Sequence, residues 1–240
     1  MNLAPRGTNK LPPLSLLRQF DAHRLVPSRH LPNGDSVLVA IADDDAHLEA
    51  IFELDLATND RLAAQQHQLS GIGLDELVFG VPHAHVVNAA FCHPHPLGAR
   101  FSGPDRGAWY AAFELETSQA EVAFHKSVHL AEVGRFEDSV TYDDFLADFT
   151  ASFHDLRHAR GFKACLAPDS YVASQELAES LLSAGSLGMI YPSVRGDGGT
   201  CLACFRPALV ANVRRDRSYR FTWHGSPQPT VSTEPVRRRS

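Results

Sequence analysis

The fold is decided by the stretch Gly98-Ala-Arg-Phe-Ser-Gly-Pro-Asp-Arg-Gly-Ala-Trp-Tyr-Ala-Ala112, followed closely by Leu115-Glu-Thr-Ser-Gln-Ala-Glu-Val-Ala-Phe-His125. Glycine and proline recur in the first half of this stretch, which predicts a loop. The run 108–112 is apolar and aromatic, and predicts a short strand. From Ser118 to Leu130 apolar residues recur at helical spacing on one side, which predicts a helix. A loop, a strand and a helix therefore follow one another directly.

The C-terminal half predicts a further helix and two strands. Residues 175–184 have helical spacing and end before Gly185, a residue typical of the position just after a helix. Strands are expected at 187–191 and 200–205, joined by the glycine-rich segment 195–199. Because helices and strands are mixed without regular alternation, the sequence predicts an α+β domain rather than a doubly wound sheet.

The remaining segments give weaker signals. The expectations for them are a loop over 1–35 apart from the apolar pair Leu25-Val26, a helix over 43–56, a short buried strand over 86–91, a turn over 93–98, and short elements of undecided type over 140–149 and 162–166.

Composition and charge limit the classes of function. A chain of 240 residues, 44% of them hydrophobic, can fill one core of ordinary domain size. The net charge of -6 argues against a broad nucleic-acid-binding surface. No apolar run reaches the roughly 18 residues that would span a bilayer, and no signal region is apparent at the N-terminus. The four cysteines are too scattered for a disulfide framework, so we expect a cytoplasmic protein.

Three residues near the deciding stretch have side chains that suit cleavage of a nucleotide. Arg100 can bind a pyrophosphate through two parallel hydrogen bonds. Tyr110 offers an aromatic face for a ring such as nicotinamide. Glu121 can stabilise the positive charge that develops on a ribose as its leaving group departs.

Each of these residues also has a structural interpretation. Glu121 lies three residues after Ser118, and this spacing alone favours a helix capping box over catalysis. Tyr110 on a strand is typical of a core residue, and an arginine in a loop, such as Arg100, is usually solvated. Ser193 follows Pro192 and fits a residue that caps a turn. Spacing alone therefore leaves both interpretations open.

Taken together, the long motifs resemble the signature of RES-domain proteins. The third motif consists of Gly188-Met-Ile-Tyr-Pro-Ser-Val-Arg195, then Gly198-Gly199, then Cys204-Phe-Arg-Pro207. The order, the spacing and the glycine positions of all three motifs fit this family over roughly residues 20–210. The resemblance implies a single α+β domain with a twisted, split sheet like that of ADP-ribosyltransferases, and a nucleotide in the cleft between its halves.

The resemblance also implies an activity and roles for particular residues. Members of the family consume NAD, passing ADP-ribose to water, to phosphate or to a protein. Arg100 would grip the pyrophosphate, with Arg24 as a second contact, and Tyr110 would border the nicotinamide. Glu121 would stabilise the ribosyl cation, and Ser193 would hydrogen-bond the substrate near the scissile bond. NAD would be the substrate, and no metal would be needed.

Partners and boundaries follow from the same resemblance. Many family members are toxins whose site is occluded by a cognate antitoxin of the Xre-like kind, so we expect such a protein partner and neither nucleic acid nor membrane. The RES domain is expected over residues 21–215, between an irregular extension (1–20) and a tail rich in proline and arginine (216–240). Two departures, Phe101 for a common tryptophan and Trp109 before Tyr110, leave open which aromatic ring faces the nicotinamide.

Two other classes of function remain as alternatives. A metal-dependent hydrolase would use the histidine-rich segment around Cys92, whose histidines are His83, His85, His93 and His95. Cys201-Leu-Ala-Cys204 has the spacing of a zinc knuckle, but it lacks a second pair, and in a strand the two sulfurs would face opposite sides. The third class is a non-catalytic binding module, which the joint presence of Arg100, Tyr110, Glu121 and Ser193 disfavours.

Overall fold

A computed structural model describes residues 11–28 and 71–234, and the helix expected over 43–56 lies outside them. Within this part of the chain seven strands form one mixed sheet in the order β1-β2-β5-β4-β3-β6-β7, with an additional pairing of β1 to β3. The strands are β1 (Leu14–Pro27), β2 (Trp109–Ala112), β3 (Glu137–Asp155), β4 (Gly188–Pro192), β5 (Thr200–Cys204), β6 (Ala211–His224) and β7 (Thr230–Glu234). The helices are α4 (Ala84–Cys92), α5 (Leu115–Val133) and α6 (Val172–Ser183), with short 3-10 turns η2 (Leu74–Glu76), η3 (Lys163–Leu166) and η4 (Pro207–Leu209).

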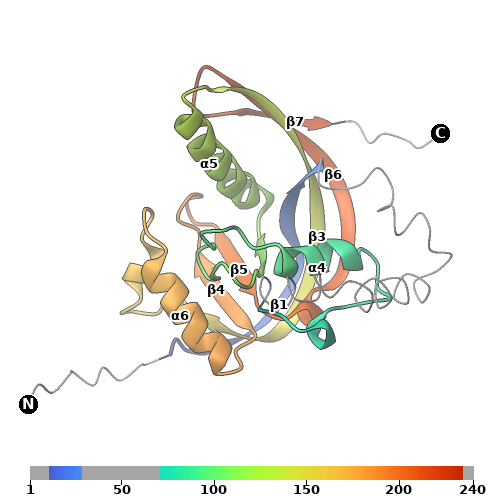
Figure 1. Ribbon diagram of the computed structural model, residues 1–240, viewed down its shortest axis with the longest axis vertical. Coiled ribbons are helices and arrows are strands. Elements are labelled where there is room, and N and C mark those ends of the chain that lie inside the picture. Colours follow the sequence, from blue (N-terminus) through green and yellow to red (C-terminus); the bar gives the residue numbers. More distant parts are fainter. Residues whose placement is uncertain (1–10, 29–70, 235–240) are drawn as a thin grey trace, which may run out of the picture.

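The sheet is split into a long-stranded half and a short-stranded half. The strands β1, β3, β6 and β7 pair in long antiparallel ladders, and β2, β5 and β4 form the short half. The halves meet where His23 pairs with Ala112, and where the end of β3 runs parallel to the start of β4. In Figure 1 the curved strands β3 and β6 lie on one side, with β4, β5, α5 and α6 on the other. The expected α+β class with a twisted, split sheet is confirmed.

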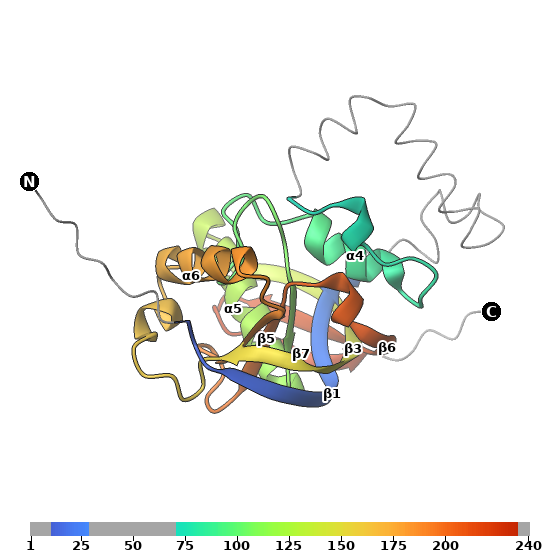
Figure 2. The same ribbon diagram turned by 90° about the horizontal axis from the view of Figure 1, so that it is seen from below.

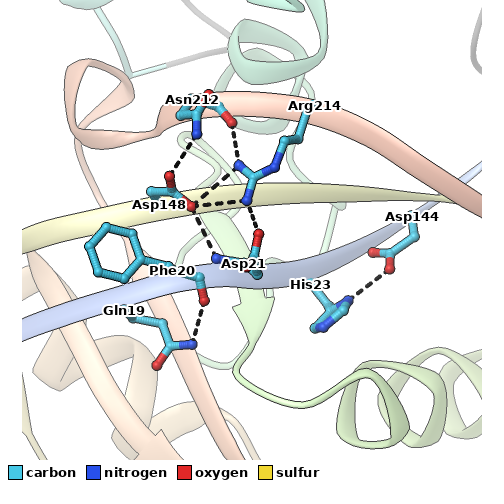
Figure 3. A network of polar contacts seen from close by, with 8 residues as sticks. All are labelled: Gln19, Phe20, Asp21, His23, Asp144, Asp148, Asn212 and Arg214. Carbon is cyan, nitrogen blue, oxygen red and sulfur yellow. Dashed lines mark hydrogen bonds and ion pairs between the residues drawn. The ribbon is translucent and has the colours of Figure 1, made fainter.

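A polar cluster ties three long strands together at one point (Figure 3). Asp148 on β3 accepts hydrogen bonds from the backbone N–H of Asp21 at 3.0 Å and from the Nδ2 of Asn212 at 2.8 Å. Arg214 pairs with both Asp148 and Asp21. Asp21 and Asn212 have φ angles of 55° and 50°, in a region that L-residues rarely adopt, and the strand registers shift beside them. The cluster therefore holds two bulges on either side of β3.

The side chains of β2 and β5 alternate between two hydrophobic clusters on opposite sides of the sheet. Trp109 and Cys204 belong to one cluster, packed with the long strands. Ala112 and Cys201 belong to the other, packed with α6, and Tyr110 packs against it. Helix α4, at the right in Figure 2, packs on the first cluster through Val86, Val87 and Phe91, whereas α6, at the left, packs on the second. The sulfurs of Cys201 and Cys204 thus face opposite sides, as expected for strand residues.

Most of the expected elements in the described part are confirmed, although their ends differ. The strand at 108–112, the helices at 118–130 and 175–184, the turn at 93–98 and the two strands after Gly185 are all present. Gly185 has a φ angle of +77° directly after the cap residue of α6, as expected of a helix-ending glycine. No helix among the described residues is long and apolar enough to cross a membrane.

Two segments differ in kind from their expectation. Residues 86–91 are part of helix α4 rather than a strand, because Val87 and Phe91 are one helical turn apart and both face the core. Residues 14–24 form β1 rather than a loop, and the exposed Leu14, Leu16 and Phe20 on its outer face hide the alternation that would have revealed a strand.

Two undecided segments and the C-terminal region are also resolved by the structure. Residues 140–149 lie within β3, and 162–166 largely form η3. The strand β6 continues past residue 216, where a tail was expected, because Tyr219, Phe221 and Trp223 alternate into a hydrophobic cluster. Residues 11–20, expected to be irregular, contribute to β1.

Gly188 begins β4 with a φ angle of +142°, and a Cβ there would lie 2.2 Å from the carbonyl oxygen of Ala203. We therefore expect Gly188→Ala to lower the free energy of unfolding by about 2–4 kcal/mol in urea denaturation. Gly103→Ala is the matched control, because a Cβ at Gly103 meets nothing within 4 Å, and we expect a change within about 0.5 kcal/mol. Equal stability of the two variants would contradict this account of β4.

Candidate active site

Helix α5 begins earlier than the sequence suggested, and its start is attached to β5. Glu114 is the N-cap residue, and its Oε2 accepts hydrogen bonds from the Thr117 hydroxyl at 2.9 Å and from the backbone N–H of Thr200 at 3.0 Å. Ser118 and Glu121 consequently lie inside the helix, so the capping box expected from their spacing is wrong. Glu121 therefore does not cap the helix.

Glu121 meets Ser193, which is 72 residues away in the sequence. The Ser193 hydroxyl donates a hydrogen bond of 2.6 Å to Oε1 of the Glu121 carboxylate. The same hydroxyl oxygen accepts hydrogen bonds from the backbone N–H groups of Arg195 at 3.1 Å and Gly196 at 2.9 Å. A hydroxyl has one proton to donate and two lone pairs, so all three are in use and its direction is fixed.

The loop between β4 and β5 packs tightly against the first turns of α5. A Cβ at Gly199 would lie 2.1 Å from the Thr117 hydroxyl oxygen, so only glycine allows this close approach. Within the loop, the N–H of Ser193 donates to the carbonyl of Gly199 at 2.8 Å. The loop therefore carries Ser193 to the side chain of Glu121 on a fixed backbone.

Tyr110 lies on the side of β2 that faces away from the cluster containing Trp109. Its hydroxyl donates to the Ser102 Oγ at 3.0 Å and accepts from the backbone N–H of Phe101 at 3.1 Å. These two hydrogen bonds join the loop that precedes β2 to the strand itself. Burial raises the pKa of Tyr110 to about 12, so the phenol stays neutral. Trp109 is fully buried on the other side, which leaves Tyr110 as the aromatic residue of this pair on the side of Cys201.

Arg100 is 6% exposed and holds the segment that follows η3. Its Nη1 donates to the carbonyls of Cys165 at 3.2 Å and Ala167 at 2.8 Å, and its guanidinium lies over the ring of Tyr171 at 4.8 Å. The Nε and Nη2 atoms of Arg100 donate no hydrogen bond to any described residue. One edge of the guanidinium is thus anchored, and the other retains donors for an anion.

Arg24 stands on the Trp109 side of β2. Its guanidinium lies 4.8 Å from the centre of the Trp109 ring, and its Nη1 donates to the backbone carbonyl of Tyr110 at 3.1 Å. Burial lowers the pKa of Arg24 to about 10, and none of the carboxylates in the described residues forms an ion pair with it. Neither of these two contacts involves Glu121 or Ser193.

Electrostatic effects on two neighbouring side chains link the remaining site residues. Burial raises the pKa of the Tyr191 phenol well above its ordinary value, and the charges of Glu121 and Arg100 also act on it. Burial likewise lowers the pKa of His125, with Glu121 opposing this shift and Arg195 and Arg100 adding to it. The charges of Arg100 and Glu121 therefore act on the same two side chains, and Ser193 is joined to Glu121 by its hydrogen bond.

Two residues of this region had no functional role in the sequence analysis. The guanidinium of Arg195 lies 3.3 Å from the centre of the Phe124 ring on α5, and its Nη2 donates to the carbonyl of Pro168. The Sγ of Cys201 lies 3.8 Å from Oε1 of Glu121. Arg195 could have been noticed as the cation two residues after Ser193, whereas nothing in the sequence pairs Cys201 with Glu121.

The histidine-rich segment is spread over α4 and the turn that follows it. The ring of His83 packs edge-on against Phe145, and the Nδ1 of His95 accepts from the backbone N–H of Leu97. Within residues 11–28 and 71–234, no three histidine, cysteine or carboxylate side chains are grouped so that they could hold a metal ion.

The sequence model of the RES domain family matches residues 77–224, which is more than half of the chain. The chain belongs to the RES domain family. The resemblance read from the three motifs is thereby confirmed. Arg100, Tyr110, Glu121 and Ser193 all lie inside the matched RES domain, whereas β1 with Arg24 precedes it.

Among solved structures, the RES domain is similar to the M. tuberculosis MbcT–MbcA toxin–antitoxin complex. The match has 14% sequence identity and a TM-score of 0.41, and it covers 56% of this chain and 75% of that chain. No curated protein matches the chain.

The observed start of α5 makes a prediction about helix capping in this RES domain. We expect Glu114→Ala to lower the free energy of unfolding by about 1–2 kcal/mol, because Glu114 accepts one hydrogen bond from Thr117 in the first turn of α5 and one from the backbone of Thr200 on β5. Ser118→Ala should change it by less than about 0.5 kcal/mol, since alanine suits a helix interior. Urea denaturation measures both, and a larger loss for Ser118→Ala would restore the capping box.

Proposed function

We propose that this RES domain cleaves the bond between nicotinamide and ribose in NAD, without a metal ion. The observation that carries the proposal is the Glu121 carboxylate, held by Ser193 at 2.6 Å and free of the capping role that its sequence spacing suggested. A carboxylate oriented in this way suits a reaction in which positive charge develops on the substrate.

Glu121 would act on the ribose. Departure of nicotinamide leaves an oxocarbenium-like ribosyl group, and a nearby negative charge lowers the barrier to its formation. Oε1 of Glu121 already accepts the hydroxyl of Ser193, whereas Oε2 accepts no hydrogen bond from any residue in the described ranges. Oε2 is therefore the atom that we assign to the ribose.

Ser193 would act mainly by orienting Glu121. Its proton points to the carboxylate, and both of its lone pairs accept backbone N–H groups. A direct bond from Ser193 to the substrate would require one of these to be given up. We therefore place Ser193 beside the scissile bond as the residue that fixes the direction of the carboxylate.

Arg100 and Tyr110 would bind the substrate on either side of the ribose, at the pyrophosphate and at the nicotinamide. Arg100 retains donors on one edge of its guanidinium, which suits the pyrophosphate. Tyr110 supplies a neutral ring at the border of the nicotinamide. Arg24 is the second candidate for the phosphates, because its positive charge has no carboxylate partner among the described residues.

The acceptor of ADP-ribose distinguishes glycohydrolase, phosphorylase and ADP-ribosyltransferase versions of this reaction. Water is the simplest acceptor, and the mass of the product separates the three reactions: free ADP-ribose, ADP-ribose phosphate or a modified protein.

Because uncontrolled NAD loss would poison a cell, we also propose that the chain is a toxin and that a cognate antitoxin covers the site. An antitoxin that leaves NAD turnover unchanged on binding would refute that part.

The charge of Glu121 can be removed with little change of shape. We expect Glu121→Gln to lower the rate of NAD loss about a hundredfold or more while the protein stays folded. Glu132→Gln is the matched control, because Glu132 is exposed on the same helix, and its turnover should equal that of the wild type. Release of nicotinamide, followed by chromatography, measures both. Full turnover by Glu121→Gln would refute the proposed role.

Replacing Arg100 by lysine keeps the positive charge but removes the pair of parallel N–H donors. We expect Arg100→Lys to raise the KM for NAD at least about tenfold, because lysine cannot bind a phosphate through two parallel hydrogen bonds. Arg160→Lys, at an exposed position, should leave KM unchanged. If Arg100→Lys lowers the melting temperature but leaves KM as it was, Arg100 only anchors the carbonyls of Cys165 and Ala167.

A further inference from the structure

Cys201 is a buried thiol in direct contact with the proposed catalytic carboxylate. It lies on β5 opposite Tyr191 of β4 and Ala112 of β2, and it is 3% exposed. Its Sγ lies 3.8 Å from Oε1 of Glu121, within reach of a sulfur hydrogen bond. Neither the zinc-knuckle nor the ordinary-core interpretation of Cys201 accounts for this contact.

The thiol keeps its proton, so it can only donate to the carboxylate. Burial and the negative charge of Glu121 both raise the pKa of Cys201 far above its usual value. A neutral thiol is a weak donor, and a carboxylate only accepts, which fixes the direction of the hydrogen bond from Sγ to Oε1.

Two donors therefore converge on one oxygen of Glu121. Ser193 reaches Oε1 from the loop between β4 and β5, and Cys201 reaches it from the strand itself. Oε2 accepts nothing from the described residues. Two donors from different backbone positions restrict the rotation of a carboxylate more than one donor can.

We propose that Cys201 is a positioning residue, whose thiol holds Oε1 of Glu121 in place so that Oε2 faces the substrate. The inference rests on the proposed function, because it assigns Oε2 to the ribose. It predicts that loss of the thiol disturbs the reacting geometry and leaves substrate binding largely intact.

The chain provides a matched control on the same strand. Cys204 is also fully buried, but it lies on the opposite side of β5, where its Sγ donates to the carbonyl of Arg206. Cys204→Ala therefore removes a thiol of the same strand without touching Glu121. A merely structural role of buried cysteines would give both variants the same effect.

The test compares steady-state NAD cleavage by full-length Cys201→Ala, Cys201→Ser and Cys204→Ala proteins. We expect Cys201→Ala to lower kcat about tenfold with KM within twofold of the wild type. Cys201→Ser keeps a donor and should recover most of kcat, and Cys204→Ala should keep at least half of it. If Cys201→Ala does not fold, Cys201→Val fills the volume without donating. Equal kcat for the Cys201 and Cys204 alanine variants, or no recovery with serine, overturns the proposal.

A second measurement separates this proposal from the proposed function. The drop in melting temperature caused by Cys201→Ala is measured in the wild type and in a Glu121→Gln background, and the contact predicts a smaller drop in the latter. A wild-type protein that leaves NAD intact refutes the proposed function, and equal drops in the two backgrounds refute the contact.

Discussion

The attachment of α5 to the hairpin of β4 and β5 is the interaction on which the candidate site depends. Glu114 binds Thr117 and Thr200, and thereby fixes where the helix begins and how it is rotated. Two turns later the helix presents Glu121 to Ser193. A shift of the helix start by one residue would rotate Glu121 by about 100°, away from its partner. The geometry of the carboxylate is thus set by a contact outside the proposed chemistry.

The attachment of α5 to the hairpin of β4 and β5 is supported by polar contacts within the long-stranded half of the sheet. The long strands are held by the cluster around Asp148, and His23 bonds to the fully buried Asp144 at 2.7 Å next to the junction with β2 (Figure 3). Among the described residues, the hydrogen bonds to the Glu121 carboxylate come from Ser193 in the loop after β4 and from Cys201 on β5. Alternation along β2 and β5 then sorts the side chains: Tyr110 and Cys201 face the site region, and Trp109 and Cys204 fill the opposite core.

The sequence predicted the elements of the site better than their connections. Helical spacing found α5, but Ser118 and Glu121 have the spacing of a capping box and yet lie inside the helix, because α5 begins at Leu115. The pair of Glu121 and Ser193 joins residues 72 apart, and periodicity contains no information about such a contact. The motif resemblance assigned both residues to one site but did not predict their hydrogen bond. Strand β1 was missed because Leu14, Leu16 and Phe20 make its exposed face apolar, and Cys201 gave no signal because a buried cysteine is usual in a strand.

The most direct test of the central claim is a crystal structure of the Glu121→Gln variant with NAD bound. The account predicts that the ribose carbon bonded to nicotinamide lies within about 4 Å of the residue-121 side chain, on the side of Oε2, with Arg100 at the pyrophosphate. The cleft of about 480 Å³ between α6 and the loop 101–107 offers a contrary location. NAD bound there, with its nicotinamide bond remote from position 121, would contradict the account.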